Sequence, residues 1–232
     1  MIIEKTADGS STIYLPGMDE HYHSVKGART ESQHIFLSMG YDHCMAQSPV
    51  VMEFGFGTGL NALLTALRAG ETTRPTTYIA LDNTTLPADV VDALGYADGL
   101  DDEGRRIFQA MHQAEWGREA AISPYFTIRK VRCDFTRPAG WQDGTRCDIV
   151  YFDAFAPDKQ EGVWTAELFA AIHDTLSDGG MLVTYCAKGS VRRNLQSVGF
   201  TVERLPGPPG GKREILRATK HAQTTQDINV KQ

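Results

Sequence analysis

The sequence predicts an α/β protein with a doubly wound, mostly parallel sheet, for three reasons. Short apolar runs of strand length alternate with amphipathic helical segments over most of the chain. A glycine-rich turn, EFGFGTG at residues 53–59, joins the first of these runs to the first of these helices. Acidic residues follow several of the runs, at the strand ends where Rossmann-like sheets bind ligands. We therefore expect a ligand site at the carboxyl edge of the sheet.

The expected elements follow from the hydrophobic pattern. Strands buried on both faces are continuous apolar runs, and a helix carries an apolar stripe and often ends at glycine. The expected strands are 49–54, 76–82, 125–134, 147–155, 181–186, 200–205 and 213–219. The expected helices are 58–69, 164–180 and 191–199, with residues 86–120 mainly helical and polar.

An extension is expected at the N-terminus and a tail at the C-terminus. Residues 1–15 have two strand-like runs around the turn signal ADGS, which predicts a hairpin. Residues 26–39 have apolar side chains at helical spacing. We expect the extension to cover residues 1–40, the main domain residues 41–220, and a disordered tail residues 221–232.

Composition excludes several classes of protein. The chain has 232 residues and a net charge of −6, which argues against a large nonspecific nucleic-acid surface but not against a local basic patch. No apolar run approaches the roughly 18 residues of a membrane helix, and no signal peptide is recognisable, so a cytoplasmic location is expected. The four cysteines are scattered without a zinc-ligand pattern, and no metal is expected.

The glycine turn indicates which cofactor it binds. Gly55 suits a sharp turn, Gly57 lets a ligand approach the backbone, and Gly59 lets the helix start close to the strand. A dinucleotide turn more often has the spacing GxGxxG, with its helix N-terminus at a pyrophosphate. Here the spacing is GxGxG, and Glu53 would repel a phosphate. A carboxylate at that position suits the α-ammonium of S-adenosylmethionine.

Acidic residues after the next strands also fit an S-adenosylmethionine site. Asp82 ends the second strand, where a carboxylate accepts ribose hydroxyls. Asp134 follows the third strand, where it would accept the exocyclic amine of adenine. Asp153, in the segment DAFAP, follows the fourth strand and would face a methyl donor. Because an amine is largely protonated at neutral pH, Asp153 would hold its hydrogens, and Phe155 would lean on an aromatic substrate.

A basic pair near the C-terminus is a candidate for substrate binding. Lys212 and Arg213 follow the flexible segment PGPPG and would close over an anionic substrate. Lys188, Arg192 and Arg193 would add to the same basic patch. Solvated surface charge is the alternative interpretation of this cluster.

Longer motifs resemble a known family. EFGFGTGLN, YFDAFAPDKQEGVWTAELF, GGMLVTYCAKGSVRRNLQSVGF with GKREIL, and HYHSVKGARTESQHIFL are similar to the methyltransferase domain of the MnmC family, which forms 5-methylaminomethyl-2-thiouridine at the tRNA wobble position. The resemblance runs from about residue 19 to about residue 216. It implies a class I methyltransferase sheet, S-adenosylmethionine as donor, the anticodon wobble uridine of tRNA as partner, and Asp153 beside the acceptor amine.

The resemblance and the motifs together give two sets of expected site residues. The cofactor set is Glu53, Gly55, Phe56, Gly57, Thr58, Gly59, Asn61, Asp82, Cys133, Asp134 and Asp153. The substrate set is Tyr22, Glu31, Phe155, Lys212 and Arg213. Asp153 is the expected catalytic residue.

Alternatives remain at this point. Bifunctional members of the family also carry a flavin-dependent oxidase domain, which this sequence is expected to lack, so the aminomethyl substrate would come from a separate oxidase partner or be made another way. A methyltransferase of the same fold that acts on a small-molecule or protein amine is the main alternative. A binding module with a vestigial pocket is less favoured, because Glu53, Asp82 and Asp153 are all present. A nicotinamide dehydrogenase is the least favoured, because of Glu53 and the GxGxG spacing.

Overall fold

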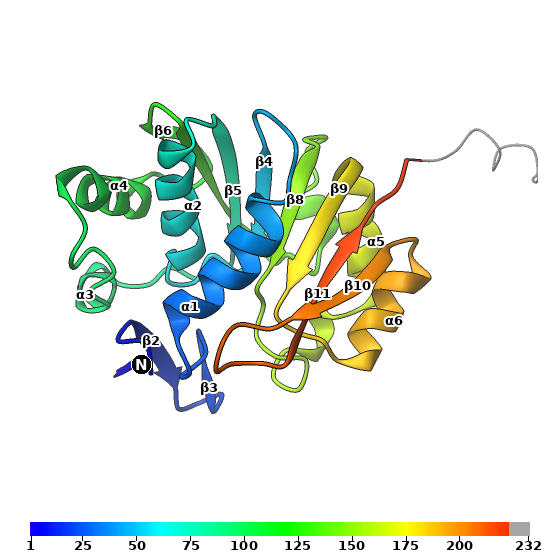
Figure 1. Ribbon diagram of the computed structural model, residues 1–232, viewed down its shortest axis with the longest axis horizontal. Helices are drawn as coiled ribbons and strands as arrows, with labels where there is room; N and C mark the ends of the chain where they lie inside the picture. The colour runs from blue at the N-terminus through cyan, green and yellow to red at the C-terminus, as the bar shows by residue number, and fades with distance from the viewer. Residues whose placement is uncertain (223–232) are drawn as a thin grey trace, which may run out of the picture.

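The computed structural model describes residues 1–222 and has an eight-stranded sheet between two layers of helices (Figure 1). The strands follow the order β10-β11-β9-β8-β4-β5-β7-β6. Their bounds are β4 Val50–Phe54, β5 Thr76–Asp82, β6 Glu119–Ser123, β7 Phe126–Arg132, β8 Cys147–Phe152, β9 Leu176–Thr184, β10 Thr201–Pro206 and β11 Glu214–Thr219. The α-helices after the N-terminal segment are α2 Leu60–Glu71, α3 Ala88–Ala93, α4 Asp102–Gln113, α5 Ala166–Thr175 and α6 Gly189–Ser197.

The sheet is parallel at its centre and antiparallel at both ends. Strands β7, β5, β4, β8 and β9 pair in parallel, whereas β6 and the β11–β10 pair run antiparallel to their neighbours. The strand order reverses at β4, because β5 lies on one side of it and β8 on the other. In such sheets the ligand binds beside the reversal point. The glycine turn leaves β4 at that point.

Two apolar cores hold the layers together. One face of the sheet packs against the N-terminal helix, α2 and α4, through buried side chains such as Phe36, Leu63 and Phe108. The opposite face packs against α5 and α6, through residues such as Phe169 and Leu195. This two-sided burial explains why the central strands are continuous apolar runs in the sequence.

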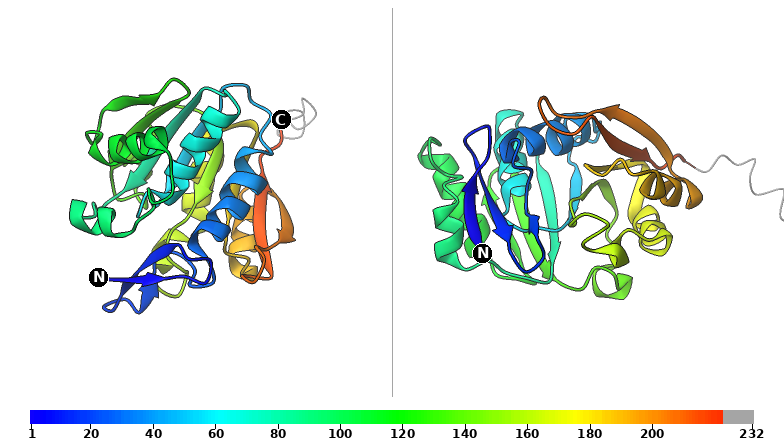
Figure 2. Two further views of the ribbon diagram at one scale, coloured as in Figure 1. Left: turned by 60° about the vertical axis from the view of Figure 1, so that its left-hand side comes forward. Right: turned by 90° about the horizontal axis from the view of Figure 1, so that it is seen from below.

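The N-terminal segment lies across the carboxyl ends of the strands (Figures 1 and 2). The expected hairpin is confirmed: β1 (Ile2–Lys5) pairs with β2 (Ser11–Leu15), and a short third strand, β3 (Glu20–His21), joins them. The expected helix is also present, but only Ala28–Ser32 (α1) is α-helical. Gln33–Tyr41 (η1) is a π-helix, a rare form that sequence periodicity does not reveal.

The structure differs from the expected elements in three further places. The helix expected over 164–180 ends at Thr175, and residues 176–180 belong to β9, because Leu176 pairs with Cys147 and the backbones of Gly179 and Gly180 pair with Lys220. Residues 86–120 contain two helices and also the edge strand β6. Short 3-10 turns, η2 (Pro138–Gly140) and η3 (Glu161–Val163), interrupt two loops.

The domain division stays a prediction, as does the disorder of the tail, since residues 223–232 lie outside the described part of the chain. Within residues 1–222, no helix has the length and apolarity needed to cross a membrane. No group of three or more histidine, cysteine, aspartate or glutamate side chains in the same range is arranged to hold a metal ion.

Candidate active site

The glycine turn has the backbone conformation that its sequence implies. Gly55, Gly57 and Gly59 all have positive φ angles, of 99°, 49° and 74°. A Cβ atom at Gly55 would lie 2.8 Å from the carbonyl oxygen of Asp153, and one at Gly57 would lie 3.0 Å from the Tyr22 ring. Only glycine combines these dihedrals with such close approach of a neighbouring strand.

A cavity of about 360 Å³ opens beside this turn, and we call it the glycine-loop cavity. Its walls include Gly57, Thr58, Asp82, Phe135 and Asp153. The N-terminal segment closes its outer side with Leu15, Met18 and Tyr22. No lysine or arginine is among the residues that line it, whereas two carboxylates are. The charge of this cavity therefore suits a cationic ligand and opposes a pyrophosphate.

Asp82 lies where a ribose-binding acid is expected. It is 8% exposed, and it accepts hydrogen bonds from the Gly57 amide, the Thr84 amide and the Thr84 hydroxyl, each at 2.9 Å. These bonds fix the carboxylate at the cavity wall. Since a carboxylate offers about four acceptor positions, capacity remains for ligand hydroxyls.

The residues expected to bind adenine lie differently from the expectation. Asp134 accepts hydrogen bonds from the Thr136 amide and hydroxyl and pairs with Arg137, so its carboxylate caps a turn. Neither Asp134 nor Cys133 is among the lining residues, whereas Phe135 is. Their roles in cofactor binding remain predictions. Phe135 was missed because a single phenylalanine after a strand gives no signal in the sequence.

A second cavity, of about 280 Å³, shares a wall with the first, and we call it the Glu31 cavity. It is lined by Glu31, Tyr185 and Lys212. The two cavities have five lining residues in common: Tyr22, His23, Asp153, Ala154 and Phe155. Asp153 therefore lines both cavities.

Four of the five expected substrate residues meet charge or aromatic partners in the Glu31 cavity. Lys212 Nζ lies 2.8 Å from Glu31 Oε2 and 4.3 Å from the centroid of the Tyr185 ring. Tyr22 packs edge-on against Phe155, with 5.2 Å between ring centroids. The expected neighbour of Lys212, Arg213, is exposed and does not line either cavity.

Asp153 is connected to Glu53 through Asn61. The Asn61 amide donates to Asp153 Oδ2 at 2.8 Å and to Glu53 Oε1 at 2.9 Å. Burial raises the pKa of Asp153 to about 7, and Glu31 adds to the shift, while the Asn61 bond and Lys212 oppose it. The Asp153 carboxyl thus changes charge near neutral pH.

Glu53 lies beneath the glycine turn and does not line either cavity. It is 0% exposed, and burial raises its pKa well above the ordinary value. Among the described residues its Oε2 atom has no hydrogen-bond partner, and neither has Asn61 Oδ1. The geometry links Glu53 to the site through Asn61, and direct contact with a cofactor ammonium remains a prediction.

The remaining expected cofactor residues, Phe56, Thr58 and Gly59, lie at or next to the wall of the glycine-loop cavity. Thr58 lines the cavity, and its hydroxyl lies 2.7 Å from His23 Nε2. Burial lowers the pKa of His23 to about 4, so this imidazole is neutral. Gly59 is the N-cap of α2, and the ring of Phe56, which lines the cavity, lies against Gly59 and His112. Sequence reasoning missed the partnership between His23 and Thr58 because 35 residues separate them.

Comparison with known proteins agrees with this geometry. The structure superposes on the crystal structure of MNMC2 from Aquifex aeolicus with a TM-score of 0.74 over 97% of this chain and 73% of that one, at 21% identity. It also superposes on a methyltransferase from Pyrococcus furiosus, with a TM-score of 0.51 over 90% of this chain and 91% of that one, at 18% identity. The fold is that of a class I methyltransferase.

Sequence similarity also relates the chain to methyltransferases. Residues 127–221 match a family described as S-adenosyl-L-methionine-dependent methyltransferase. The chain is similar to the tRNA 5-methylaminomethyl-2-thiouridine biosynthesis bifunctional protein MnmC of Cupriavidus metallidurans, at 27% identity over 93% of this chain and 33% of that protein. With the MnmC protein of Pseudomonas fluorescens the identity is 32%, over 86% of this chain and 32% of the relative.

The chain spans about a third of the length of these curated relatives. The expected resemblance to the MnmC methyltransferase domain is confirmed, and so is the expected class I sheet. The matched family also supports S-adenosylmethionine as the cofactor.

Proposed function

We propose that this chain is an S-adenosylmethionine-dependent N-methyltransferase that converts 5-aminomethyl-2-thiouridine to 5-methylaminomethyl-2-thiouridine at the wobble position of tRNA. One observation supports the reaction class most strongly. A cavity that has two carboxylates and no lysine or arginine meets a second cavity at the Asp153 carboxyl. The substrate is proposed from the similarity to the MnmC proteins.

The residues of the glycine-loop cavity fit S-adenosylmethionine. Asp82 offers acceptors for ribose hydroxyls, Phe135 offers an aromatic face for adenine, and the glycine turn leaves room for close backbone approach. When bound, this cofactor supplies a methyl group on a positively charged sulfur. The buried Glu53–Asn61–Asp153 group lies on the same side of the cavity, and Asp153 adds negative charge there when it is ionised.

The Glu31 cavity suits an amine attached to a planar ring. A substrate ammonium would be attracted by Asp153 and Glu31, and the ring would pack against the Tyr22–Phe155 pair. Lys212 would donate to an acceptor atom of the ring or a nearby phosphate. These contacts restrict the orientation of the amine, which is the main contribution that a protein makes to a displacement reaction.

Asp153 would take a proton from the substrate ammonium. Its pKa of about 7 means that a large fraction is ionised at neutral pH, and an ionised Asp153 can accept that proton directly. The neutral amine then has the lone pair that methyl transfer requires. Asn61 keeps the Asp153 carboxyl in place, since its amide donates to Oδ2 at 2.8 Å.

A cytoplasmic location and an upstream oxidase are part of this proposal. The relatives are named as bifunctional proteins, which implies a second activity in them. For this chain, a separate oxidase would supply the aminomethyl substrate.

The test of the proposed function is incubation of the purified chain with S-adenosylmethionine and tRNA that lacks the final methyl group, followed by nucleoside mass analysis. A gain of one methyl on the wobble nucleoside supports the proposal. Methylation of a small amine, with tRNA unchanged, would favour the alternative of a small-molecule substrate.

A further inference from the structure

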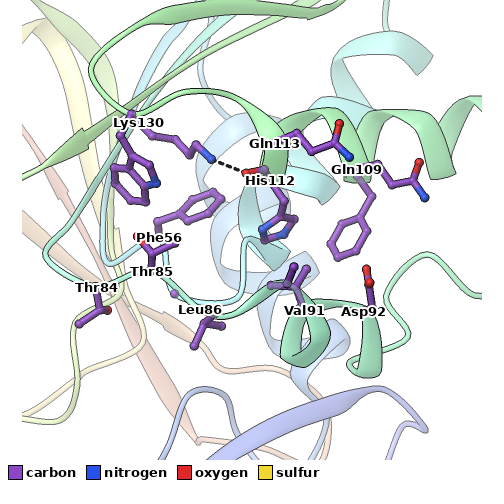
Figure 3. Close-up of a pocket in the computed structure, with 14 residues that line it drawn as sticks. Phe56, Thr84, Thr85, Leu86, Val91, Asp92, Gln109, His112, Gln113 and Lys130 are labelled. Atoms are coloured by element: carbon purple, nitrogen blue, oxygen red, sulfur yellow. Dashed lines mark hydrogen bonds between the residues drawn. The ribbon is translucent and has the colours of Figure 1, made fainter.

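A third cavity, which the proposed reaction does not use, lies between the sheet and the helices α3 and α4 (Figure 3). It has a volume of about 470 Å³, and we call it the Lys130 cavity. Figure 3 shows Lys130 and Phe56 at one end and Asp92 and Gln109 at the other. This space and the glycine-loop cavity are neighbours that share five lining residues: Phe56, Gly57, Thr84, Thr85 and Leu86.

One end of the Lys130 cavity carries positive charge that the protein does not neutralise. Lys130 is 2% exposed, and its ammonium donates to the backbone carbonyl of His112 at 2.8 Å. Within residues 1–222, no carboxylate oxygen lies within 4 Å of the Lys130 or Arg132 side-chain nitrogens. A buried ammonium without a counter-ion is unfavourable unless something else supplies the negative charge.

Aromatic rings surround this charge. Lys130 Nζ lies 5.3 Å from the centroid of the Trp116 ring and 5.8 Å from that of Phe56, and the Arg132 guanidinium lies 5.6 Å from Trp116. Arg132 also donates to the Thr85 hydroxyl at 2.5 Å. Desolvation lowers the pKa of Lys130 to about 8, which still leaves it mostly protonated at neutral pH. The rings stabilise the cations only in part.

The opposite walls offer hydrogen-bonding groups of mixed type. Gln109 and Gln113 are four residues apart on α4, and each amide supplies donors and an acceptor. Thr84 and Thr85 add hydroxyl groups on the other side. Aromatic walls, amide edges and a cation are together the chemistry that binds a nucleobase with a phosphate.

We propose that the Lys130 cavity is a second binding site, for a nucleotide whose phosphate lies toward Lys130 and whose base packs among the aromatic rings. The same chemistry is present in a free mononucleotide and in one nucleotide of an RNA chain. This proposal does not depend on methyl transfer, because it requires binding only.

Calorimetry with uridine 5′-monophosphate tests the site, with uridine and inorganic phosphate as partial ligands and a single-stranded RNA trinucleotide as the polymer. Lys130→Met removes the charge and keeps the length of the side chain. Ala88→Trp places a bulky ring at an exposed residue that lines the cavity, so it blocks the space without disturbing the core. Lys26→Met, at an exposed lysine outside the cavity, is the matched control. Thermal unfolding midpoints check that every variant is folded.

The mononucleotide should bind at least about tenfold more tightly than uridine or phosphate alone, which corresponds to about 1.4 kcal/mol. Lys130→Met and Ala88→Trp should each weaken it at least about tenfold, and Lys26→Met should leave it unchanged within about twofold. Binding of the trinucleotide alone, with the same dependence on Lys130, would support the RNA source. The proposal would be overturned if neither the mononucleotide nor the trinucleotide bound. It would also be overturned if Lys130→Met or Ala88→Trp left the affinity unchanged.

Discussion

Glu53 and Asp153 share the side-chain amide of Asn61, which donates to one oxygen of each carboxyl group at 2.9 and 2.8 Å. The glycine turn passes over this group, and the Asp153 carboxyl faces both cavities. One buried network therefore connects the base of the proposed cofactor site with the proposed acceptor. This network accounts for the presence of three polar residues, Glu53, Asn61 and Asp153, in the core beneath the turn.

Asp153→Ala should abolish most turnover and weaken cofactor binding much less, because Asp82 and the glycine turn remain. The carboxyl is expected to accept the substrate proton, and loss of such a group typically costs about 10²- to 10⁴-fold in rate. Single-turnover rates and calorimetry with S-adenosylmethionine measure the two properties separately. Asp158→Ala, at an exposed carboxylate that pairs with Lys188, is the control. Equal loss of binding and turnover would make Asp153 a structural residue.

The rate of methyl transfer should rise with pH through a pKa near 7. Burial raises the Asp153 pKa from 3.8 to about 7, so the ionised form that accepts a proton becomes populated as pH increases through that value. The sign for stability is opposite: the contribution of this carboxyl is fully present below its unfolded pKa of 3.8 and is lost as pH rises through about 7. A pH–rate profile of kcat tests this, and a limb near 7 that persists in Asp153→Asn would contradict it.

Lys212→Met should weaken acceptor binding and leave cofactor affinity unchanged. The ammonium contacts Glu31 and the Tyr185 ring in the Glu31 cavity, which is separate from the proposed ribose and adenine positions. Hydrogen bonds to charged groups contribute about 1.5–3 kcal/mol, so KM for tRNA should rise about tenfold or more. Arg213→Met is the matched variant one residue away, at an exposed side chain outside both cavities, and it should change KM less. If Lys212→Met and Arg213→Met raised KM equally, the effect would be one of surface charge alone.

Gly55→Ala should destabilise the fold and prevent cofactor binding. The φ angle of 99° and the 2.8 Å approach of the Asp153 carbonyl oxygen both oppose a Cβ atom. Left-handed strain costs about 1–2 kcal/mol, and overpacking adds about 1–3 kcal/mol. Gly9→Ala is a useful control, because Gly9 has a φ of 83° but open space at the Cβ position. Denaturant unfolding should show the larger loss for Gly55→Ala, and equal losses would mean that the close approach is unimportant.

Much of the fold followed from local pattern, and the exceptions had tertiary causes. Leucine spacing predicted α2, and continuous apolar runs predicted the central strands, because two-sided burial leaves a clear signal. Residues 176–180 were misassigned as helix because Gly179 and Gly180 have the composition of a helix stop. Their strand partners, on β8 and near Lys220, are distant in sequence.

The candidate site shows the same division between local and distant signals. Asp82 and Asp153 were predicted at strand ends, and the structure places both at the glycine-loop cavity. The contacts of Glu53 with Asn61 and of His23 with Thr58 depend on how the N-terminal segment and α2 pack, which no motif encodes. Lys130 gave no signal at all, because an alternating strand face does not show whether a lysine is exposed or buried.

Isothermal calorimetry with S-adenosylmethionine and, separately, with NAD⁺ tests the central claim most directly. A cavity with Asp82 and Asp153 and without lysine or arginine should bind the cationic cofactor, with one site per chain, and should give no heat with the pyrophosphate cofactor. Absence of binding by S-adenosylmethionine, or preferential binding of NAD⁺, would contradict the account.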